Sequence, residues 1–150
     1  MPLTKLNSAS VIDRLPIGSV LQTKFVQIDT PETLPSYSSN TSTAINSTAL
    51  NITPNATNSK ILLEAQISFE SGNYPWAQIW FFYRDTTKLG HAPTGNRLVG
   101  VGIPTVSHHG DYGGNTSDQV TLRYIDSPTT TSQITYKIGF HTGSQTNTIY

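Results

Sequence analysis

Apolar and polar side chains alternate along residues 59–70, and this alternation constrains the fold more than any other feature of the sequence. Successive side chains of a β-strand point to opposite faces, so a period of two indicates a strand with one buried face. The predicted solvent face carries Lys60, Glu64, Gln66, Ser68 and Glu70. The predicted buried face carries Ile61, Leu63, Ala65, Ile67 and Phe69.

Three further segments have a similar length and are separated by clusters of Gly, Pro, Asn and Thr, which is typical of strands joined by turns. They are residues 76–84, 118–126 and 132–141, and we expect them to be partners of the strand at 59–70. The last two are expected to form a hairpin around the turn SPTTTS. In that hairpin Val120, Leu122 and Tyr124 would face Ile134, Tyr136, Ile138 and Phe140.

Two weaker segments complete the prediction of an all-β chain. Residues 18–28 (GSVLQTKFVQI) are predicted to form the first strand, and residues 43–52 a short one. A chain of 150 residues suits a single domain with a real core. We therefore expect a β-domain over residues 18–150, preceded by a short N-terminal arm over residues 1–17.

The composition excludes several classes of partner. The formal net charge is zero, charged residues make up 12% of the chain, and Ser, Thr and Asn together about a third. Binding to nucleic acid depends on Lys and Arg that neutralise phosphates, so we expect no nucleic-acid partner. The longest apolar run is far shorter than a bilayer requires, so we expect no membrane insertion. The absence of cysteine excludes disulfides and thiolate chemistry.

The N-terminal arm has the spacing of apolar residues seen in a short helix, with Pro16 as its stop. It is either a frayed terminus, because short isolated helices are marginal in water, or an arm that docks on another protein. It lacks the basic start and apolar core of a secretory signal, so we expect synthesis in a cytoplasm. The residues that would dock are Leu3, Leu6, Val11, Ile12 and Leu15.

The segment 76–84 carries aromatic side chains on both of its faces. Such a strand is either covered twice within the chain or lies at a contact between subunits, because large exposed aromatic patches are rare on monomers. We predict the second arrangement, in a homotrimer whose subunit interface contains Trp80 and Phe82. Closed symmetry would satisfy the same patch on every copy.

No catalytic signature is present, and we expect no enzyme, no cofactor and no metal. His108 and His109 are metal-capable neighbours, but adjacent residues of a strand point apart, so a solvated loop is the preferred interpretation over a metal site or a histidine ring around a symmetry axis. Aromatic faces can stack on sugars, which makes Tyr74, Trp76 and Tyr112 candidate glycan contacts. Burial in a core or an interface is the preferred interpretation of these aromatics.

Three short motifs carry a resemblance to a known family. GSVLQ at 18–22 is followed by a Ser/Thr-rich stretch, then by LNITP at 50–54 and SKILL at 59–63. This succession resembles the small β-sandwich modules in virion proteins of tailed bacteriophages, especially marine and cyanobacterial phages. The resemblance extends from about Gly18 to Tyr150.

The resemblance implies an antiparallel, jelly-roll-like β-sandwich that assembles as a homotrimer. It also implies a fibre, tail appendage or capsid decoration on the virion, made in the host cytoplasm and bound to other virion proteins through the N-terminal arm. A host cell-surface glycan is an expected further partner. Two features depart from the pattern: only about 17 residues precede the β-domain, and the chain stops where further β-structure is expected. A soluble, lectin-like carbohydrate-binding module is the alternative function.

Overall fold

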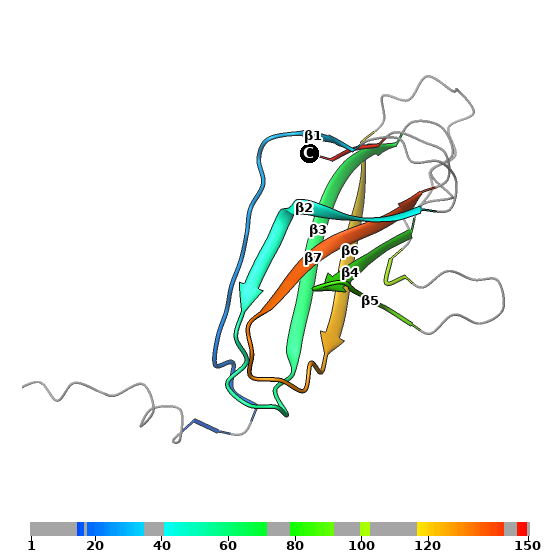
Figure 1. The fold of residues 1–150 in the computed structure, drawn as a ribbon. Coiled ribbons are helices and arrows are strands. Elements are labelled where there is room, and N and C mark those ends of the chain that lie inside the picture. Colours follow the sequence, from blue (N-terminus) through cyan, green and yellow to red (C-terminus); the bar gives the residue numbers. More distant parts are fainter. Residues whose placement is uncertain are drawn as a thin grey trace, which may run out of the picture.

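The computed structural model describes residues 15–16, 18–34, 41–71, 79–91, 100–102, 117–142 and 147–149. Throughout these residues the protein is all-β, as predicted, and its eight strands form two antiparallel four-stranded sheets (Figure 1). The first sheet contains, in spatial order, β1 (Glu32–Leu34), β8 (Asn147–Ile149), β3 (Ile61–Ser71) and β6 (Ser117–Asp126). The second contains β2 (Thr41–Ile52), β7 (Ile134–Thr142), β4 (Ile79–Arg84) and β5 (Thr87–Leu89).

The two sheets bury a common core, to which the inward face of β3 contributes the residues that the alternation predicts. Ile61, Leu63, Ile67 and Phe69 are buried, and Ala65 packs against them. Across the core the ring of Trp80 in β4 lies 5.1 Å from that of Phe69 and 5.6 Å from that of Phe140, centroid to centroid. Each large apolar side chain buried in this way stabilises the fold by about 1.5–3 kcal/mol.

The predicted hairpin of the last two long strands is wrong. β6 pairs with β3, whereas β7 pairs with β2 and β4, so the two consecutive strands belong to different sheets. Their apolar faces do meet, but across the core. The connection from Ser127 to Gln133 is longer than a tight hairpin turn and buries Pro128, which allows the chain to cross from one sheet to the other.

The first predicted strand is also wrong. Residues 18–28 are not part of either sheet, and 79% of Val20 and 85% of Phe25 are exposed. In Figure 1 this segment (blue) runs along one side of the two sheets toward β1. A β-propensity only becomes a strand when a neighbouring edge supplies hydrogen bonds, and that pairing is absent from the described residues around 18–28.

The predicted subunit interface at β4 requires a correction as well. Trp80 is 0% exposed and Phe82 5% exposed within a single chain, because both point into the core between the sheets. Phe81, on the opposite face, is also fully buried. Of the two arrangements that an aromatic strand allows, β4 therefore has the first, with both faces covered inside the chain, and a second copy has no access to Trp80 or Phe82.

Candidate functional site

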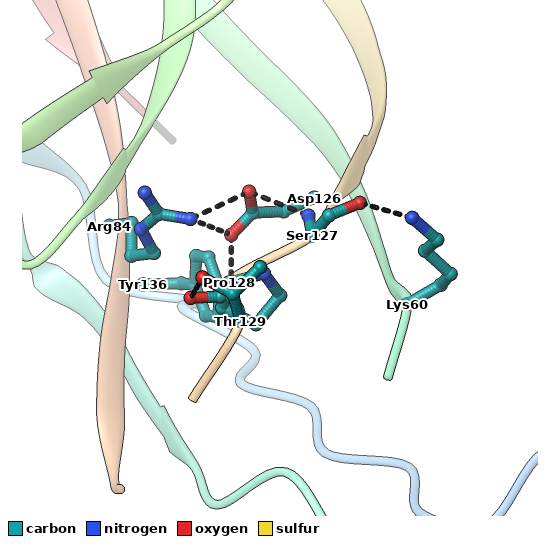
Figure 2. A network of polar contacts seen from close by, with 7 residues as sticks. All are labelled: Lys60, Arg84, Asp126, Ser127, Pro128, Thr129 and Tyr136. Carbon is teal, nitrogen blue, oxygen red and sulfur yellow. Dashed lines mark hydrogen bonds and ion pairs between the residues drawn. The ribbon is translucent and has the colours of Figure 1, made fainter. Parts of the chain in front are cut away.

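A buried carboxylate joins the two sheets at one end of the core (Figure 2). Asp126, the last residue of β6, accepts hydrogen bonds from Nη1 of Arg84 at 3.0 and 3.1 Å. The hydroxyl of Tyr136 in β7 donates a third, at 2.6 Å, and the backbone N–H of Ser127 a fourth, at 2.8 Å. Arg84 and Tyr136 come from the second sheet and Asp126 from the first, so this network connects the two layers.

The chemistry of the network favours a structural role. The carboxylate of Asp126 is 6% exposed, and its oxygens already accept four hydrogen bonds. Burial, followed by the hydrogen bond to Asp126, raises the pKa of Tyr136. Tyr136 therefore remains a proton donor to Asp126 at neutral pH. Lys60 extends the network to the surface through its 2.6 Å hydrogen bond to Oγ of Ser127.

Sequence reasoning missed this network although a signal for it was present. Asp126 continues the inward alternation of Val120, Leu122 and Tyr124, and Arg84 continues that of Trp80 and Phe82. Two opposite charges at inward positions of two strands indicate a buried ion pair.

A second polar cluster lies on the outer face of the second sheet. His141 is opposite Ile79 in the β4–β7 register, one position beyond the core pair of Phe140 and Trp80, so its side chain points away from the core. Its Nδ1 lies 3.1 Å from Oγ of Ser42. Nζ of Lys88 donates to the same hydroxyl at 3.1 Å and lies 3.9 Å from the centre of the Phe81 ring.

His141 is buried, whereas Ser42 and Lys88 are half-buried. Burial, and then the charge of Lys88, lowers the pKa of His141, so the imidazole is held neutral. Burial also lowers the pKa of Lys88. A serine nucleophile needs a base, a group that orients that base and donors for an oxyanion. Among the described contacts, His141 could serve as the base for Ser42, but no contact supplies the orienting group or the oxyanion donors.

The third feature is a cleft of about 380 Å³ on the open side of the two sheets. One wall is β3, whose Leu63 and Ile67 belong to the core, and the other is the second sheet at Leu50 and Ile138. Residues 24–28 line its mouth. The cleft therefore lies between β3, the second sheet and residues 24–28.

β2 is irregular where it borders the cleft. Its register against β7 shifts between Ile45 and Leu50. The side chain of Thr48 replaces the lost backbone pairing, because its hydroxyl donates to the carbonyl of Ile45 and accepts from the N–H of Ile138. These two hydrogen bonds stabilise the irregularity, and Thr48 also lines the cleft.

Among the described residues, six exposed apolar side chains lie in the unpaired segment and on the first sheet, and three of them, Phe25, Val26 and Leu62, line the cleft. Four of them belong to the unpaired segment, and two are direct cross-strand neighbours on the outer face of the first sheet. On a surface that is otherwise rich in Ser, Thr and Asn, such a group indicates a contact surface. These residues are Val20, Leu21, Phe25, Val26, Leu62 and Ile125.

Most residues that the sequence proposed for sites lie outside the described part of the chain. Of the arm residues, Leu15 is described and is 40% exposed. The arm residues Leu3, Leu6, Val11 and Ile12, the candidate glycan contacts Tyr74, Trp76 and Tyr112, and the pair His108 and His109 fall outside the described residues.

Within the described ranges no three metal-capable side chains come together. The same ranges contain no helix of the length and apolarity that a membrane crossing requires. No protein-family model, no curated protein and no solved structure matches this chain.

Proposed function

We propose that this protein is a structural component of the surface of a tailed-bacteriophage particle: a short fibre, a tail appendage or a capsid decoration. In this proposal the two sheets form a jelly-roll-like β-sandwich, three copies associate, and residues 1–17 anchor the assembly to other virion proteins. The protein is made in the host cytoplasm and has no enzymatic role.

The observation that carries the proposal is the apolar segment beside the open cleft. Val20, Leu21, Phe25 and Val26 are between 47% and 85% exposed in a chain whose formal net charge is zero. Exposed apolar side chains on a weakly charged surface favour association with protein. The described polar clusters, by contrast, are occupied by internal contacts, such as the four hydrogen bonds to Asp126. The motifs at 18–22, 50–54 and 59–63 add the resemblance to phage virion modules.

Mass spectrometry of density-purified phage particles tests this proposal. The chain should be detected at a stoichiometry that is a multiple of three per particle, and labelled antibodies should place it on the outside in electron micrographs. Its absence from particles, in an experiment that detects the other minor virion proteins, would overturn the proposal.

The anchoring role of the arm has its own test. A variant that lacks residues 1–15 should keep the β-structure of the full chain in circular dichroism but should no longer join particles. The arm residues have no place in the strand pattern, so their removal leaves the core intact. Incorporation of the truncated protein at the full-length level would contradict the anchoring role.

Binding to a host glycan remains the further expectation, and a lectin-like module the alternative. The candidate contacts Tyr74, Trp76 and Tyr112 lie outside the described residues, so the described contacts do not favour either one. A glycan array tests both. Specific glycan binding by a chain that is missing from particles would favour the lectin-like module.

A further inference from the structure

We propose that residues 20–28 of one copy of this chain add as a strand along the open edge of β3 in a neighbouring copy, where Phe25 and Val26 close that neighbour's cleft. This inference rests on the proposed function in that it names the contact by which the copies assemble. The inference is argued from residues 20–28 and β3, whereas the predicted interface at β4 was argued from Trp80 and Phe82.

β3 provides the acceptor edge. β6 pairs with it from Ile61 to Glu70, but β8 covers its other edge only at Phe69, Glu70 and Ser71. In the described part of the chain, residues 61–68 of β3 thus have one edge without a partner strand. An uncovered edge presents a row of N–H and C=O groups and readily accepts an extended segment.

Residues 20–28 provide a donor of matching length. They form neither helix nor strand, and the hydrogen bond nearest to them, from the N–H of Ser19 to the carbonyl of Pro16, lies just before the segment. Their backbone groups are thus free among the described contacts. The segment spans nine residues, and the free edge of β3 eight, so one segment can cover one edge.

The segment lies beside the cleft of its own copy, but it does not pair with β3 there. Residues 24–28 line the mouth of the cleft, yet Phe25 is 85% exposed. Among the described residues, each copy therefore carries one unpaired stretch of β3, besides the outer edges of the two sheets, and one extended segment without strand pairing. A head-to-tail exchange pairs each segment with one such stretch of β3, and it forms a closed ring when the rotation between copies closes.

The charges of the chain are compatible with this exchange. The formal net charge is zero, so copies do not repel one another over long range. Lys24 is the only charged residue between Val20 and Ile28, and it lines the cleft together with Glu64, which already pairs with Arg123. A second copy is thus an occupant whose extended segment matches the unpaired stretch of β3 in length and whose net charge does not oppose association.

The first test compares two substitutions at neighbouring positions. Leu62 and Ile125 are cross-strand partners, exposed by 55% and 63%, but only Leu62 lines the cleft. Leu62→Lys should weaken self-association at least about tenfold, as expected for a charge placed in an interface, whereas Ile125→Lys should leave it unchanged. Light scattering coupled to size exclusion gives the oligomeric state, and circular dichroism verifies that both variants fold.

The second test separates donor from acceptor. Phe25→Ser with Val26→Ser removes the donor and keeps the acceptor edge, whereas Leu62→Lys does the reverse. Each variant alone should be a folded monomer at micromolar concentration. An equimolar mixture should form a heterodimer and nothing larger, because it contains one competent donor and one competent edge.

A crosslink distinguishes exchange between copies from closure within one copy. The chain has no cysteine, so a variant with Phe25→Cys and Leu62→Cys contains one possible disulfide pair. Under mild oxidation, exchange predicts disulfide-linked multimers in a denaturing gel. A crosslinked monomer would instead show that the segment covers its own cleft, and would overturn the inference.

The remaining outcomes separate this inference from the proposed function. An oligomeric wild type that is unaffected by every variant would overturn strand exchange and leave the trimer and the virion role standing. A monomeric wild type at micromolar concentration would overturn both the exchange and the trimer. The presence of the chain in particles tests the virion role independently.

Discussion

Nη1 of Arg84 lies 3.0 Å from Oδ1 of Asp126, and this ion pair joins strands that belong to different sheets. The hydroxyl of Tyr136 reaches the other carboxylate oxygen at 2.6 Å. The polar contacts therefore connect the layers at one end of a core that apolar packing holds together elsewhere.

Asp126→Asn should lower the free energy of unfolding by about 2–3 kcal/mol, because it leaves the half-buried guanidinium of Arg84 without its charged partner. The matched control is Glu64→Gln, which breaks the ion pair with Arg123 in the same sheet. The side chains of Arg123 and Glu64 are 73% and 50% exposed, so the loss of unfolding free energy should stay below about 1 kcal/mol. Urea unfolding measures both. Equal losses for the two variants would contradict the structural role of Asp126.

Tyr136→Phe should lower the free energy of unfolding by about 1–1.5 kcal/mol, since it removes the hydroxyl that donates to Asp126 and leaves the ring in the core. The double variant Tyr136→Phe with Asp126→Asn should lose less free energy of unfolding than the two single variants lose in sum, because the two residues share one hydrogen bond. A double-mutant cycle by urea unfolding measures this coupling. Simple additivity would show that the two side chains act independently.

Gly139→Ala should destabilise the protein by about 1–3 kcal/mol through overpacking. A Cβ atom at this position would lie 2.5 Å from Cε2 of Phe81 and 2.7 Å from Cε2 of Tyr83, so both rings of β4 would have to move. The midpoint of thermal unfolding should fall accordingly. An unchanged midpoint would contradict the close packing of these rings over β7.

The stability of the protein should decline as the pH falls below about 6.5, in part through His141. The folded protein lowers the pKa of this imidazole from its ordinary value of 6.5, by burial and then by the charge of Lys88. Folding thus disfavours the protonated form, so this contribution to stability is complete above pH 6.5 and is lost as the pH falls from there toward the folded pKa.

His141→Gln should make the unfolding midpoint less dependent on pH between about 7.5 and 5, because the variant has no imidazole to protonate at this position. Differential scanning fluorimetry across the range measures the difference from wild type. His91→Gln, at an exposed position, is the control and should keep the wild-type slope. If both variants had the same slope, His141 would not be the group responsible.

The sequence predicted the features that depend on side-chain alternation. The inward set of β3, from Ile61 to Phe69, is observed, and so are the all-β class and the strands near 43–52, 118–126 and 132–141. The buried pair of Arg84 and Asp126 was readable from the same alternation. These features are local, because each residue's face follows from its position in its own strand.

Only the tertiary structure shows which strands pair with one another. Alternation assigns a residue to a face, but it does not name the strand that will lie beside it, and β6 and β7 entered different sheets although they are consecutive in the chain. Alternation also could not show that residues 18–28 would remain unpaired, or that Trp80 and Phe82 would be buried in the core of a single chain. Pairing and burial depend on contacts between residues far apart in sequence, and such contacts are fixed only when the whole chain has folded.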